Sequence, residues 1–556
     1  MKELFDKVFK DLGYENQTKI IKSNKEADYQ CDDLFKLAKI YHKSPVDIGK
    51  AFIDKINLEK DFSKYFKEVS FAQPGFINIK VSDEYICGQL RELMGKEKFG
   101  ILKENKKIVL DYGGPNVAKP LHVGHLRTAI IGQAINNILK FAGNETISDV
   151  HLGDFGTQMG QVIYGILLDF PETAADDVEI DLEYLNETYP KISALCKEDE
   201  NVKAECLRIT KELQDGNVEY RKLWKKICAI SIDDIKGIYD YLGVHFDFWY
   251  GESDAYKEFD ELFAILNEYN LIKEDDGAKI VEVKEESDKT DISPCLIQKS
   301  DGAYLYATSD LGTILQRNRD FNPDNIIYVV DARQSLHFKQ VFRVAKKAHI
   351  YDGVLEHYGY GTVNGNNNKP FKTRTGGIMK LKDLIAEVKE EFIELREENG
   401  KMDEEDLDKI VNAILKFADL QNDFERSYIF DIKKFSEVNG KTGPYILYTY
   451  LRINKLIGTD RGILSDNIYS ESDRNLRLKI LEVSDVINMA VKERKPHYIV
   501  NYLYELSVVA NNFYQNNKVN NLEGVKRLDF NEVLSFNNKI IATLLNLLGI
   551  NIPNKM

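Results

Sequence analysis

Residues 107–150 alternate between apolar runs and a glycine-containing loop in an order that leaves few choices of fold. The run IVLDY is short and apolar, as a buried strand is, and a loop with glycine and proline follows it. A helical pattern covers residues 121–142 and ends at Gly143, and a second strand-like piece covers residues 146–150. Strand, loop, helix and strand in this order begin a doubly wound parallel sheet, so the sequence predicts an α/β domain of the Rossmann type.

Patterns on either side of this segment predict two further domains. Residues 1–102 contain Ser44 and Pro45, a helix start, and FAQPGFINIKV, a turn followed by a strand, which together predict a small α/β domain. The Rossmann domain is assigned residues 103–385, because IIYVVD at 326–331 is another buried strand, with an acidic insertion at about 171–300. Apolar residues at helical spacing dominate residues 386–556, which predicts an all-helical bundle.

Composition limits the cellular location and the partners. The chain has 556 residues and a formal net charge of −15, which disfavours nonspecific binding to nucleic acid but leaves a specific RNA partner open. The first residues include acids and no apolar core, and no apolar run approaches the ~18 residues of a membrane span. We therefore expect a cytoplasmic protein without a membrane partner.

The six cysteines are scattered and form no CxxC pair. Metal sites usually need closely spaced ligands, so reduced and mostly buried thiols are the better interpretation. We expect no structural zinc and no other metal held by the protein itself.

The segment PNVAKPLHVGH, from Pro115 to His125, carries the sharpest chemical signal. It follows a predicted strand and begins the predicted helix, where free backbone N–H groups and the helix dipole favour anions. His122 and His125 share one helix face, and Gly124 between them lets a base or ribose approach the backbone. Two imidazoles beside a helix N-terminus predict a site for a triphosphate.

An HxGH pattern alone is too short to be specific. Histidines at a helix start can also be packed or solvated residues, which is the alternative interpretation. The preceding strand and the longer string PNVAKPLH favour the nucleotide site.

Longer stretches of the chain are similar to one enzyme family. DYGGPNVAKPLHVGHLRTAIIG resembles the HIGH region of class I aminoacyl-tRNA synthetases, and specifically that of the arginyl-tRNA synthetases. HLGDFGTQMG, YLYATSDL, YVVDARQSLHFKQVFRVA, GYGTVNG and KPFKTRTGGIMKLKDLI occur in the order of that family. FAQPGFINIKVS resembles its N-terminal domain, and TGPYILYTYLRI and YLYELSVVANNFY resemble its anticodon-binding end. The resemblance covers most of the chain and is weakest in the insertion.

The resemblance implies an ATP-dependent ligase. The arginine carboxylate would attack the α-phosphate of ATP, and the terminal ribose of tRNA(Arg) would then attack the arginyl-adenylate. ATP is a substrate, Mg²⁺ is expected to bind through its phosphates, and positioning and charge stabilisation take the place of a protein nucleophile. Members of the family commonly need tRNA for the first step.

The family's motifs also imply which residues handle ATP. Where the superfamily has KMSKS, this chain has FKTRTGG at 371–377, without the usual second lysine, and Lys119 is expected to compensate. Several mobile cations can together neutralise a transferring phosphate, although a merely solvated basic loop is the alternative. The implied catalytic residues are Lys119, His122, His125, Lys372 and Arg374, and the implied ATP-binding residues are His122, Gly124, His125, Gly361 and Val363.

A site for arginine needs a carboxylate, because the hydrogen bonds between a carboxylate and the planar guanidinium are strong and fix the geometry of the pair. Asp310 matches the guanidinium-binding acid of the family, and Tyr306 shares its face if that segment is helical. Asn116 and Gln334 match positions that hold the backbone end of the amino acid, and Asp111 is a second candidate acid. Taken singly, an aspartate on a helix face is more often only solvated.

One departure from the family lies at Gly113 and Gly114, where small hydroxyl residues are usual. The pocket should survive this change, but a hydrogen bond to the substrate could be lost.

Aromatic and basic residues of the C-terminal helices predict the tRNA interface, because exposed rings stack on unpaired bases and cations meet phosphates. We assign tRNA binding to Tyr448, Arg452 and Tyr498 from a wider set. That set is Tyr445, Tyr448, Arg452, Lys492, Arg494, Lys495, Tyr498, Tyr502 and Asn511. Tyrosines at helical spacing are more often core residues. By resemblance, the N-terminal domain contacts the tRNA elbow.

Three other functions fit parts of this pattern. A class I synthetase for cysteine or glutamate is the nearest, but a cysteinyl enzyme should have zinc-ligand cysteines, and Tyr306, Asp310 and Gln334 favour arginine. A small HxGH adenylyltransferase would lack the length and the helical C-terminal half. A non-catalytic tRNA-binding paralogue is disfavoured by the intact phosphate-site residues. We expect the chain to act as a monomer.

Overall fold

The computed structural model of the chain describes residues 1–23, 27–365, 371, 379–396, 402–457 and 462–556. These residues form two compact units. The first unit comprises Met1–Ile101, Thr449–Val486 and Tyr502–Ala542, and the second comprises Leu102–Tyr448, Ile487–Asn501 and Thr543–Met556. No helix in the described ranges is long and apolar enough to cross a lipid bilayer.

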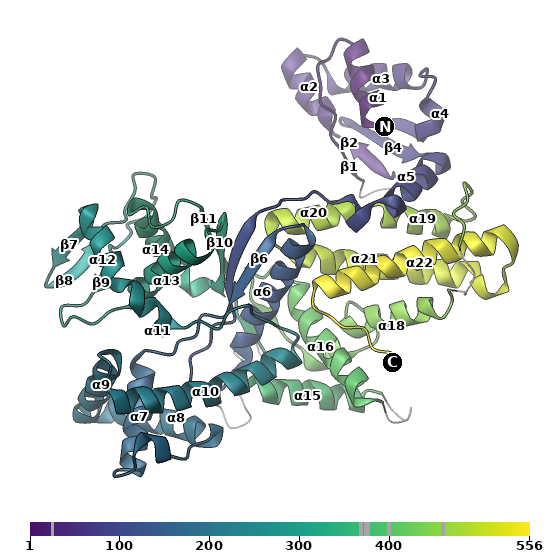
Figure 1. The fold of residues 1–556 in the computed structure, drawn as a ribbon. Helices are drawn as coiled ribbons and strands as arrows, with labels where there is room; N and C mark the ends of the chain where they lie inside the picture. Colours follow the sequence, from purple (N-terminus) through teal and green to yellow (C-terminus); the bar gives the residue numbers. More distant parts are fainter. Residues whose placement is uncertain (24–26, 366–370, 372–378, 397–401, 458–461) are drawn as a thin grey trace. The chain divides into compact units, whose positions relative to one another are not determined.

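A parallel sheet of strand order β11-β10-β5-β6 is the centre of the second unit (Figure 1). Its register places Asp111, the penultimate residue of β5, beside Asp149 at the carboxyl end of β6 and beside Tyr328 of β10. In doubly wound sheets that edge is where ligands bind. The strands are β5 (Lys107–Tyr112), β6 (Glu145–Asp149), β10 (Asn325–Asp331) and β11 (Val354–Tyr360).

Helices cover both faces of this sheet, with α6 on one side and α13 and α14 on the other (Figure 1). Gly132 of α6 lies against the ring of Tyr112, and a Cβ at this glycine would lie 2.2 Å from that ring. The glycine therefore allows the close approach that brings the start of α6 to the strand ends. These helices are α6 (Val123–Phe141), α13 (Tyr306–Phe321), η4 (Ala332–Gln334) and α14 (Ser335–Lys347).

The segment between β6 and α13 forms a helical group and a small antiparallel sheet of order β7-β8-β9. Its helices are α7 (Thr157–Asp169), η2 (Ala175–Asp177), α8 (Leu182–Glu198), α9 (Glu200–Gln214), α10 (Val218–Tyr241), α11 (Glu252–Ala255), η3 (Tyr256–Glu258) and α12 (Phe259–Glu268). Its strands are β7 (Ile272–Asp275), β8 (Ala278–Val281) and β9 (Cys295–Gln298).

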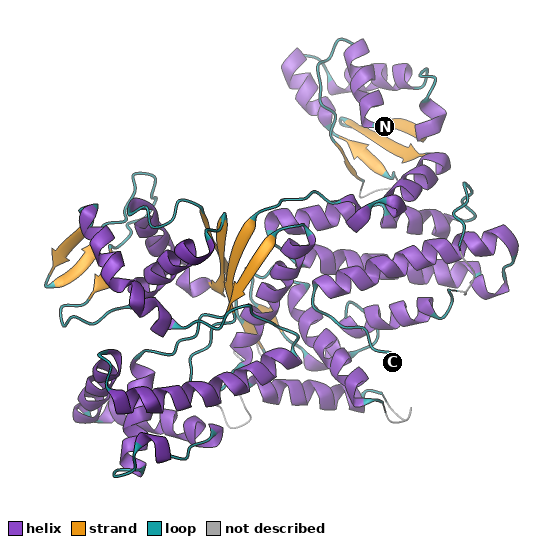
Figure 2. Cartoon of the chain, in the orientation of Figure 1, coloured by secondary structure: helices purple, strands orange, loops and turns teal. Residues whose placement is uncertain are grey.

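After β11 the second unit is mostly helical, as Figure 2 shows. Two short strands, β12 (Val363–Asn364) and β13 (Tyr428–Ile429), pair in parallel. The helices are α15 (Leu381–Glu394), α16 (Glu404–Leu420) and α17 (Ile432–Ser436).

The first unit contains an antiparallel sheet of order β1-β2-β4-β3 with helices packed on it. Ser44 caps α3 by accepting a hydrogen bond from the backbone N–H of Val46 at 3.2 Å, as its place before proline predicts. Its elements up to residue 101 are α1 (Lys2–Asp11), β1 (Ile20–Lys22), β2 (Tyr29–Cys31), α2 (Asp33–Tyr41), α3 (Pro45–Ile56), α4 (Phe62–Tyr65), β3 (Phe66–Ala72), β4 (Phe76–Val81), α5 (Asp83–Gly95) and η1 (Glu97–Gly100).

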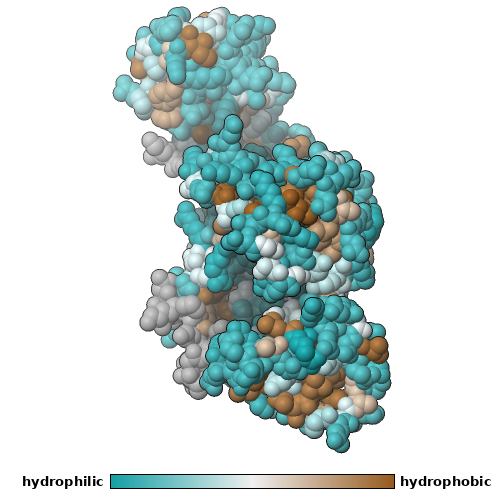
Figure 3. Space-filling model, turned by 90° about the vertical axis from the view of Figure 1, so that its left-hand side faces the viewer, coloured by the Kyte–Doolittle hydropathy of each residue, from teal (hydrophilic) through white to brown (hydrophobic). Residues whose placement is uncertain are grey.

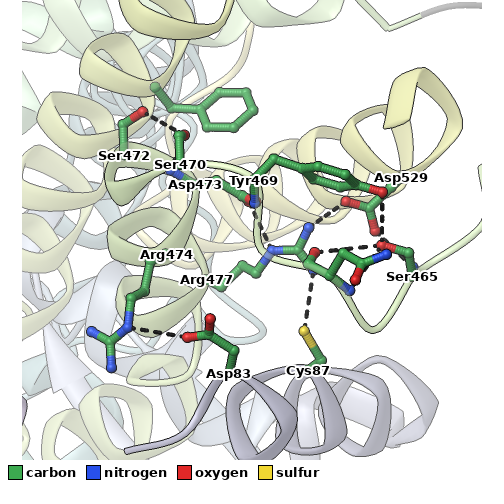
Figure 4. Close-up of polar contacts among 12 residues, drawn as sticks. Asp83, Cys87, Ser465, Tyr469, Ser470, Ser472, Asp473, Arg474, Arg477 and Asp529 are labelled. Atoms are coloured by element: carbon green, nitrogen blue, oxygen red, sulfur yellow. Dashed lines mark hydrogen bonds and ion pairs between the residues drawn. The ribbon is translucent and has the colours of Figure 1, made fainter. Parts of the chain in front are cut away.

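The C-terminal helices contribute to both units. In the first unit the fully buried Arg477 bridges Asp473 of its own helix and Asp529, and it also lies 3.8 Å from the sulfur of Cys87 (Figure 4). Arg474, one turn earlier, forms two hydrogen bonds with the carboxylate of Asp28. The elements are α18 (Gly443–Asn454), α19 (Glu471–Ile480), α20 (Val483–Glu493), α21 (His497–Asn517), η5 (Val519–Asn521) and α22 (Gly524–Leu547).

The fold class predicted from the sequence is confirmed: a parallel-sheet domain with an insertion, an N-terminal α/β region and helical C-terminal elements. The helix predicted at 121–142 is α6, and the strands predicted at 146–150 and 326–331 are β6 and β10, each within two residues at either end. The predicted domain limits of 102 and 385 stay a prediction. Figure 3 shows one face of the chain, where hydrophilic side chains predominate and hydrophobic ones form scattered patches.

Candidate active site

A cavity of about 730 Å³ opens at the carboxyl ends of β5 and β10. It is lined by residues from the α6 start, from α11, from the first turns of α13 and from η4 and α14. Of the predicted site residues, those that line it are Asp111, Asn116, His122, Gly124, His125, Tyr306, Asp310 and Gln334. The structure therefore gathers the predicted phosphate site and the predicted guanidinium site in one cavity.

The two histidines of the HxGH motif form a reciprocal cap at the start of α6. His122 Nδ1 accepts a hydrogen bond from the backbone N–H of Gly124 at 3.0 Å, and His125 Nδ1 accepts one from the backbone N–H of His122 at 3.1 Å. The ring centroids lie 3.9 Å apart. Because both Nδ1 atoms accept, a neutral ring carries its proton on Nε2, which leaves Nε2–H to donate to a ligand.

The two histidine rings do not supply positive charge to the site. Burial and the nearby Lys119 lower the pKa of His122, and burial together with His122 lowers the pKa of His125 to about 3. Both rings are therefore neutral at neutral pH. They can bind phosphate oxygens as hydrogen-bond donors, while the positive charge must come from lysine and arginine.

Lys119 lies just before the motif but not in the cavity lining. Its ammonium group is 4.5 Å from the ring centroid of Tyr189, which belongs to α8 of the insertion. This cation–π contact holds the lysine without neutralising its charge.

The residues that follow the predicted second ATP loop pair with the backbone of the HxGH region. The backbone N–H of Val123 donates a hydrogen bond to the carbonyl oxygen of Met379 at 3.2 Å. The backbone N–H of Leu381 donates one to the carbonyl oxygen of Leu121 at 2.8 Å. Lys372 and Arg374, the predicted cations of the loop, lie outside the described residues.

Gly361 and Val363 are not among the residues that line the cavity, but both follow Tyr360, which lines it, in the sequence. The carbonyl oxygen of Gly361 accepts a hydrogen bond from Arg127 Nη1 at 2.7 Å, and Val363 pairs with Tyr428 between β12 and β13. A Cβ at Gly361 would lie 2.6 Å from the backbone nitrogen of Ser427, so only glycine fits here. Their role in ATP binding stays a prediction.

The guanidinium end of the cavity is formed by α13, η4 and α14. Tyr306 begins α13, and Asp310 lies one turn later on the same helix. Both residues line the cavity, so the prediction that they share a helix face is confirmed. Gln334 ends η4 and also lines the cavity. His337 of α14, which was not singled out in the sequence, lies with Nε2 at 2.5 Å from Oδ2 of Asp310.

Glu252 is a second acid in this part of the cavity and was missed by sequence reasoning. It begins α11, and the backbone of Gly251 pairs with Leu152, which brings residue 252 beside the HLGDFG motif. Burial, with Asp154 and Asp310 nearby, raises the pKa of Glu252 to about 7, although His151 opposes this shift. No motif surrounds Glu252 in the sequence, so only the tertiary pairing reveals it.

Asp111 lines the cavity, but one of its oxygens is already engaged. The guanidinium of Arg317, which is 1% exposed, lies 2.7 Å from Oδ2 of Asp111 and 2.7 Å from Oδ2 of Asp149. Burial raises the pKa of Asp111, although Arg317 opposes this shift. Asp111 as a ligand of arginine stays a prediction, with Oδ1 the oxygen left for it.

The two glycines that depart from the family pattern have a steric reason. A Cβ at Gly114 would lie 2.6 Å from the carbonyl oxygen of His151, and a Cβ at Gly113, where φ is +77°, would lie 2.8 Å from the ring of Phe246. The N–H of Gly113 donates to Thr128 Oγ1 at 2.8 Å. The neighbouring Asn116 places its side chain against Gly153, across a backbone bridge.

The predicted tRNA-binding residues lie on the C-terminal helices. Tyr448 of α18 is 42% exposed, Arg452 of the same helix lies with its guanidinium carbon 3.8 Å from the ring centroid of Tyr514, and Tyr498 is half-buried on α21. Within the wider set, the expectation of an exposed ring is wrong for Tyr502, which is 2% exposed and donates a hydrogen bond to the carbonyl of Lys479. Tyr502 lies at helical spacing from the buried residues of α21 and therefore packs in the core.

Comparison with known proteins identifies the family. Residues 90–432 match the catalytic domain of class I tRNA synthetases of the R type, residues 446–556 match the DALR anticodon binding domain, and residues 1–81 match the arginyl tRNA synthetase N-terminal domain. The chain belongs to the arginyl-tRNA synthetases. It is thus an arginine–tRNA ligase of class I with ATP as a substrate, as the motifs predicted.

Relatives of this arginyl-tRNA synthetase match over the full length. The arginine–tRNA ligase of Francisella tularensis subsp. holarctica is 39% identical, with 100% of this chain and 99% of that protein covered. That of Alkaliphilus oremlandii is also 39% identical, with 99% and 98% covered. The crystal structure of Plasmodium falciparum arginyl-tRNA synthetase matches with a TM-score of 0.81 at 26% identity, covering 100% of this chain and 98% of that chain.

Proposed function

We propose that the enzyme joins arginine to AMP in the cavity between the α6 start and Asp310. The triphosphate of ATP lies at the α6 N-terminus, and the guanidinium of arginine lies between Asp310 and Glu252. The observation that supports this most is that a single cavity is lined both by the HxGH histidines and by these two acids. Its two ends suit the two substrates that the reaction must bring together.

The reaction needs no protein nucleophile. A carboxylate oxygen of arginine attacks the α-phosphorus of ATP, the bond to the bridging oxygen breaks, and pyrophosphate leaves. His122 and His125 donate Nε2–H bonds to phosphate oxygens, and Lys119, Lys372 and Arg374 supply the positive charge that stabilises the leaving group. Asn116 and Gln334 hold the backbone end of arginine, Asp111 is a second acid of the arginine site, and Tyr306 lies beside the guanidinium. Gly124, Gly361 and Val363 border the adenosine.

Mg²⁺ accompanies ATP and is held through its phosphates. Mg²⁺ prefers oxygen ligands and is commonly bound together with substrate phosphates. In the second step the terminal ribose of tRNA(Arg) attacks the adenylate. Tyr448, Arg452 and Tyr498 contact the tRNA, the N-terminal domain contacts its elbow, and the enzyme acts as a cytoplasmic monomer.

ATP–pyrophosphate exchange tests this assignment. The wild-type enzyme should exchange with arginine among the twenty amino acids, measured with and without tRNA(Arg). Asp310→Ala should abolish arginine-dependent exchange, because it removes an acceptor of the guanidinium. Asp352→Ala, at an exposed aspartate of the same unit, is the matched control and should retain activity. Near-normal exchange by Asp310→Ala would remove Asp310 from this role.

A further inference from the structure

His337 lines the cavity, and its ring contacts the acid to which guanidinium recognition is assigned. Its Nε2 lies 2.5 Å from Oδ2 of Asp310, and the two side chains are 26% and 18% exposed. We propose that His337 is a positioning residue, which fixes the Asp310 carboxylate in the orientation that receives the guanidinium of arginine. The inference rests on the proposed function, since it assumes that Asp310 binds this group.

The chemistry of the contact fixes its direction. An ionised carboxylate can only accept hydrogen bonds, so Nε2 of His337 carries the proton whether the ring is neutral or charged. Oδ2 of Asp310 is therefore engaged by the protein, and Oδ1 remains for the substrate. A planar guanidinium has N–H groups in fixed directions, so a carboxylate that is already oriented binds it with less loss of freedom.

The histidine itself is held by the core of the domain. Its ring meets the ring of the neighbouring Phe338 edge-on, with centroids 5.3 Å apart. Phe338 is 4% exposed and packs against Tyr328 of β10 at 4.9 Å and against His357 of β11 at 4.7 Å. The first turn of α14 is thus anchored on the sheet, which makes His337 a rigid donor.

Electrostatics gives a reason for such a donor. Asp310 lies close enough to Glu252 for its charge to contribute to the raised pKa of that acid. Two like charges repel, so a hydrogen-bond donor on Oδ2 stabilises the Asp310 carboxylate beside an ionised Glu252. Arg333, which also lines the cavity, is paired with Asp331 at 2.7 Å. His337 is the group that contacts Asp310 in the cavity that Glu252 also lines.

Exchange kinetics with His337→Leu, His337→Gln and His337→Asn test the proposal, with tRNA(Arg) present. His337→Leu removes the donor, and we expect the KM for arginine to rise about tenfold while kcat and the KM for ATP change by less than about twofold. The terminal amide of glutamine can donate from the position of Nε2, so His337→Gln should restore most of the affinity. Asparagine is too short to do so and should resemble leucine.

Two controls keep the result interpretable. His349→Leu, at an exposed histidine after the same helix, should leave all constants unchanged. If His337→Leu does not fold, the Gln and Asn variants, both polar, carry the test, since only the first can reach Asp310.

The outcomes separate this proposal from the proposed function. An unchanged KM for arginine in His337→Leu and His337→Asn, or a fall in kcat alone, would overturn the role of His337. If instead wild-type exchange does not depend on arginine, or Asp310→Asn binds arginine normally, the proposed function fails and the premise is lost. A defect in Asp310→Asn with normal His337 variants rejects only the positioning role.

Discussion

Each unit of the enzyme contains a buried arginine between two aspartates, and the two clusters differ in what surrounds them. In the first unit Arg477, Asp473 and Asp529 have fully buried side chains, and each aspartate also accepts a backbone hydrogen bond, from Tyr469 at 2.9 Å and from Ser465 at 2.7 Å. In the second unit Arg317 pairs with Asp111 and Asp149, but Asp111 also lines the cavity.

The hydrogen bonds of the two arginines show the same difference. Nε and Nη1 of Arg317 have no hydrogen-bond partner among the described residues, whereas Arg477 uses Nε for Asp473 and Nη2 for Asp529. The cluster of Arg477 is saturated and joins helices of one unit. The cluster of Arg317 leaves two guanidinium nitrogens without a partner among the described residues, and its Asp111 lines the cavity. We infer that similar ion clusters serve stability in one place and the charge of a binding site in the other.

Replacing each arginine by methionine is the strongest test of this comparison. Both Arg317→Met and Arg477→Met leave buried carboxylates without a cation, which costs about 3–5 kcal/mol of folding stability. Thermal unfolding should therefore show both variants to be strongly destabilised. Exchange per folded molecule should fall about 10²-fold only in Arg317→Met, because Asp111 and the α13 helix that carries Asp310 are displaced.

Exchange should be measured at low temperature and divided by the folded fraction, obtained by active-site titration, so that the two variants can be compared per folded molecule. Equal exchange by folded Arg317→Met and Arg477→Met would show that both clusters are purely structural. A loss of exchange in folded Arg477→Met would show that the saturated cluster also acts on the site.

A second test uses Glu252, an acid of the cavity that is not paired with any described arginine. Glu252 pairs with no lysine or arginine among the described residues, and burial raises its pKa to about 7. In the free enzyme it is half protonated at neutral pH, and a bound guanidinium favours the ionised form. The KM for arginine should therefore fall about tenfold between roughly pH 6 and pH 8, as a single group with this pKa gives.

Calorimetry in buffers of different ionisation enthalpy should detect the proton released when arginine binds near pH 7. Glu252→Gln should abolish the release and flatten the pH dependence of KM. A pH dependence that persists in Glu252→Gln would assign the titration to another group.

The sequence predicted the parts of the fold where several local signals agree. The strand, helix and strand around the HxGH motif match β5, α6 and β6 because apolar runs, a glycine stop and a loop all mark the same limits. The insertion gave no such agreement, since its acidic and mixed sequence hides the apolar faces of α8, α9 and α10. Those faces become evident only when the helices pack together.

The site could be predicted where its residues lie in one motif, and not where tertiary pairing supplies them. His122 and His125 are neighbours in sequence, and Asp310 follows Tyr306 by one helical turn. Glu252 reaches the cavity only through the pairing of Gly251 with Leu152. The neutral state of the histidines also depends on burial, which the motif does not reveal.

The smallest expected effect concerns a cation that is held without being neutralised. An ion pair, as in either arginine cluster, cancels the charge of its cation, whereas the Tyr189 ring leaves the charge of Lys119 available for phosphate. Tyr189→Leu should therefore lower kcat for exchange about threefold, as expected for one cation–π contact, and Tyr189→Phe should not. In Lys119→Met, the Tyr189→Leu change should have no further effect, because the group that the ring holds is already gone. A full threefold loss in that double variant would mean that Tyr189 acts through α8 alone, and not by holding the lysine.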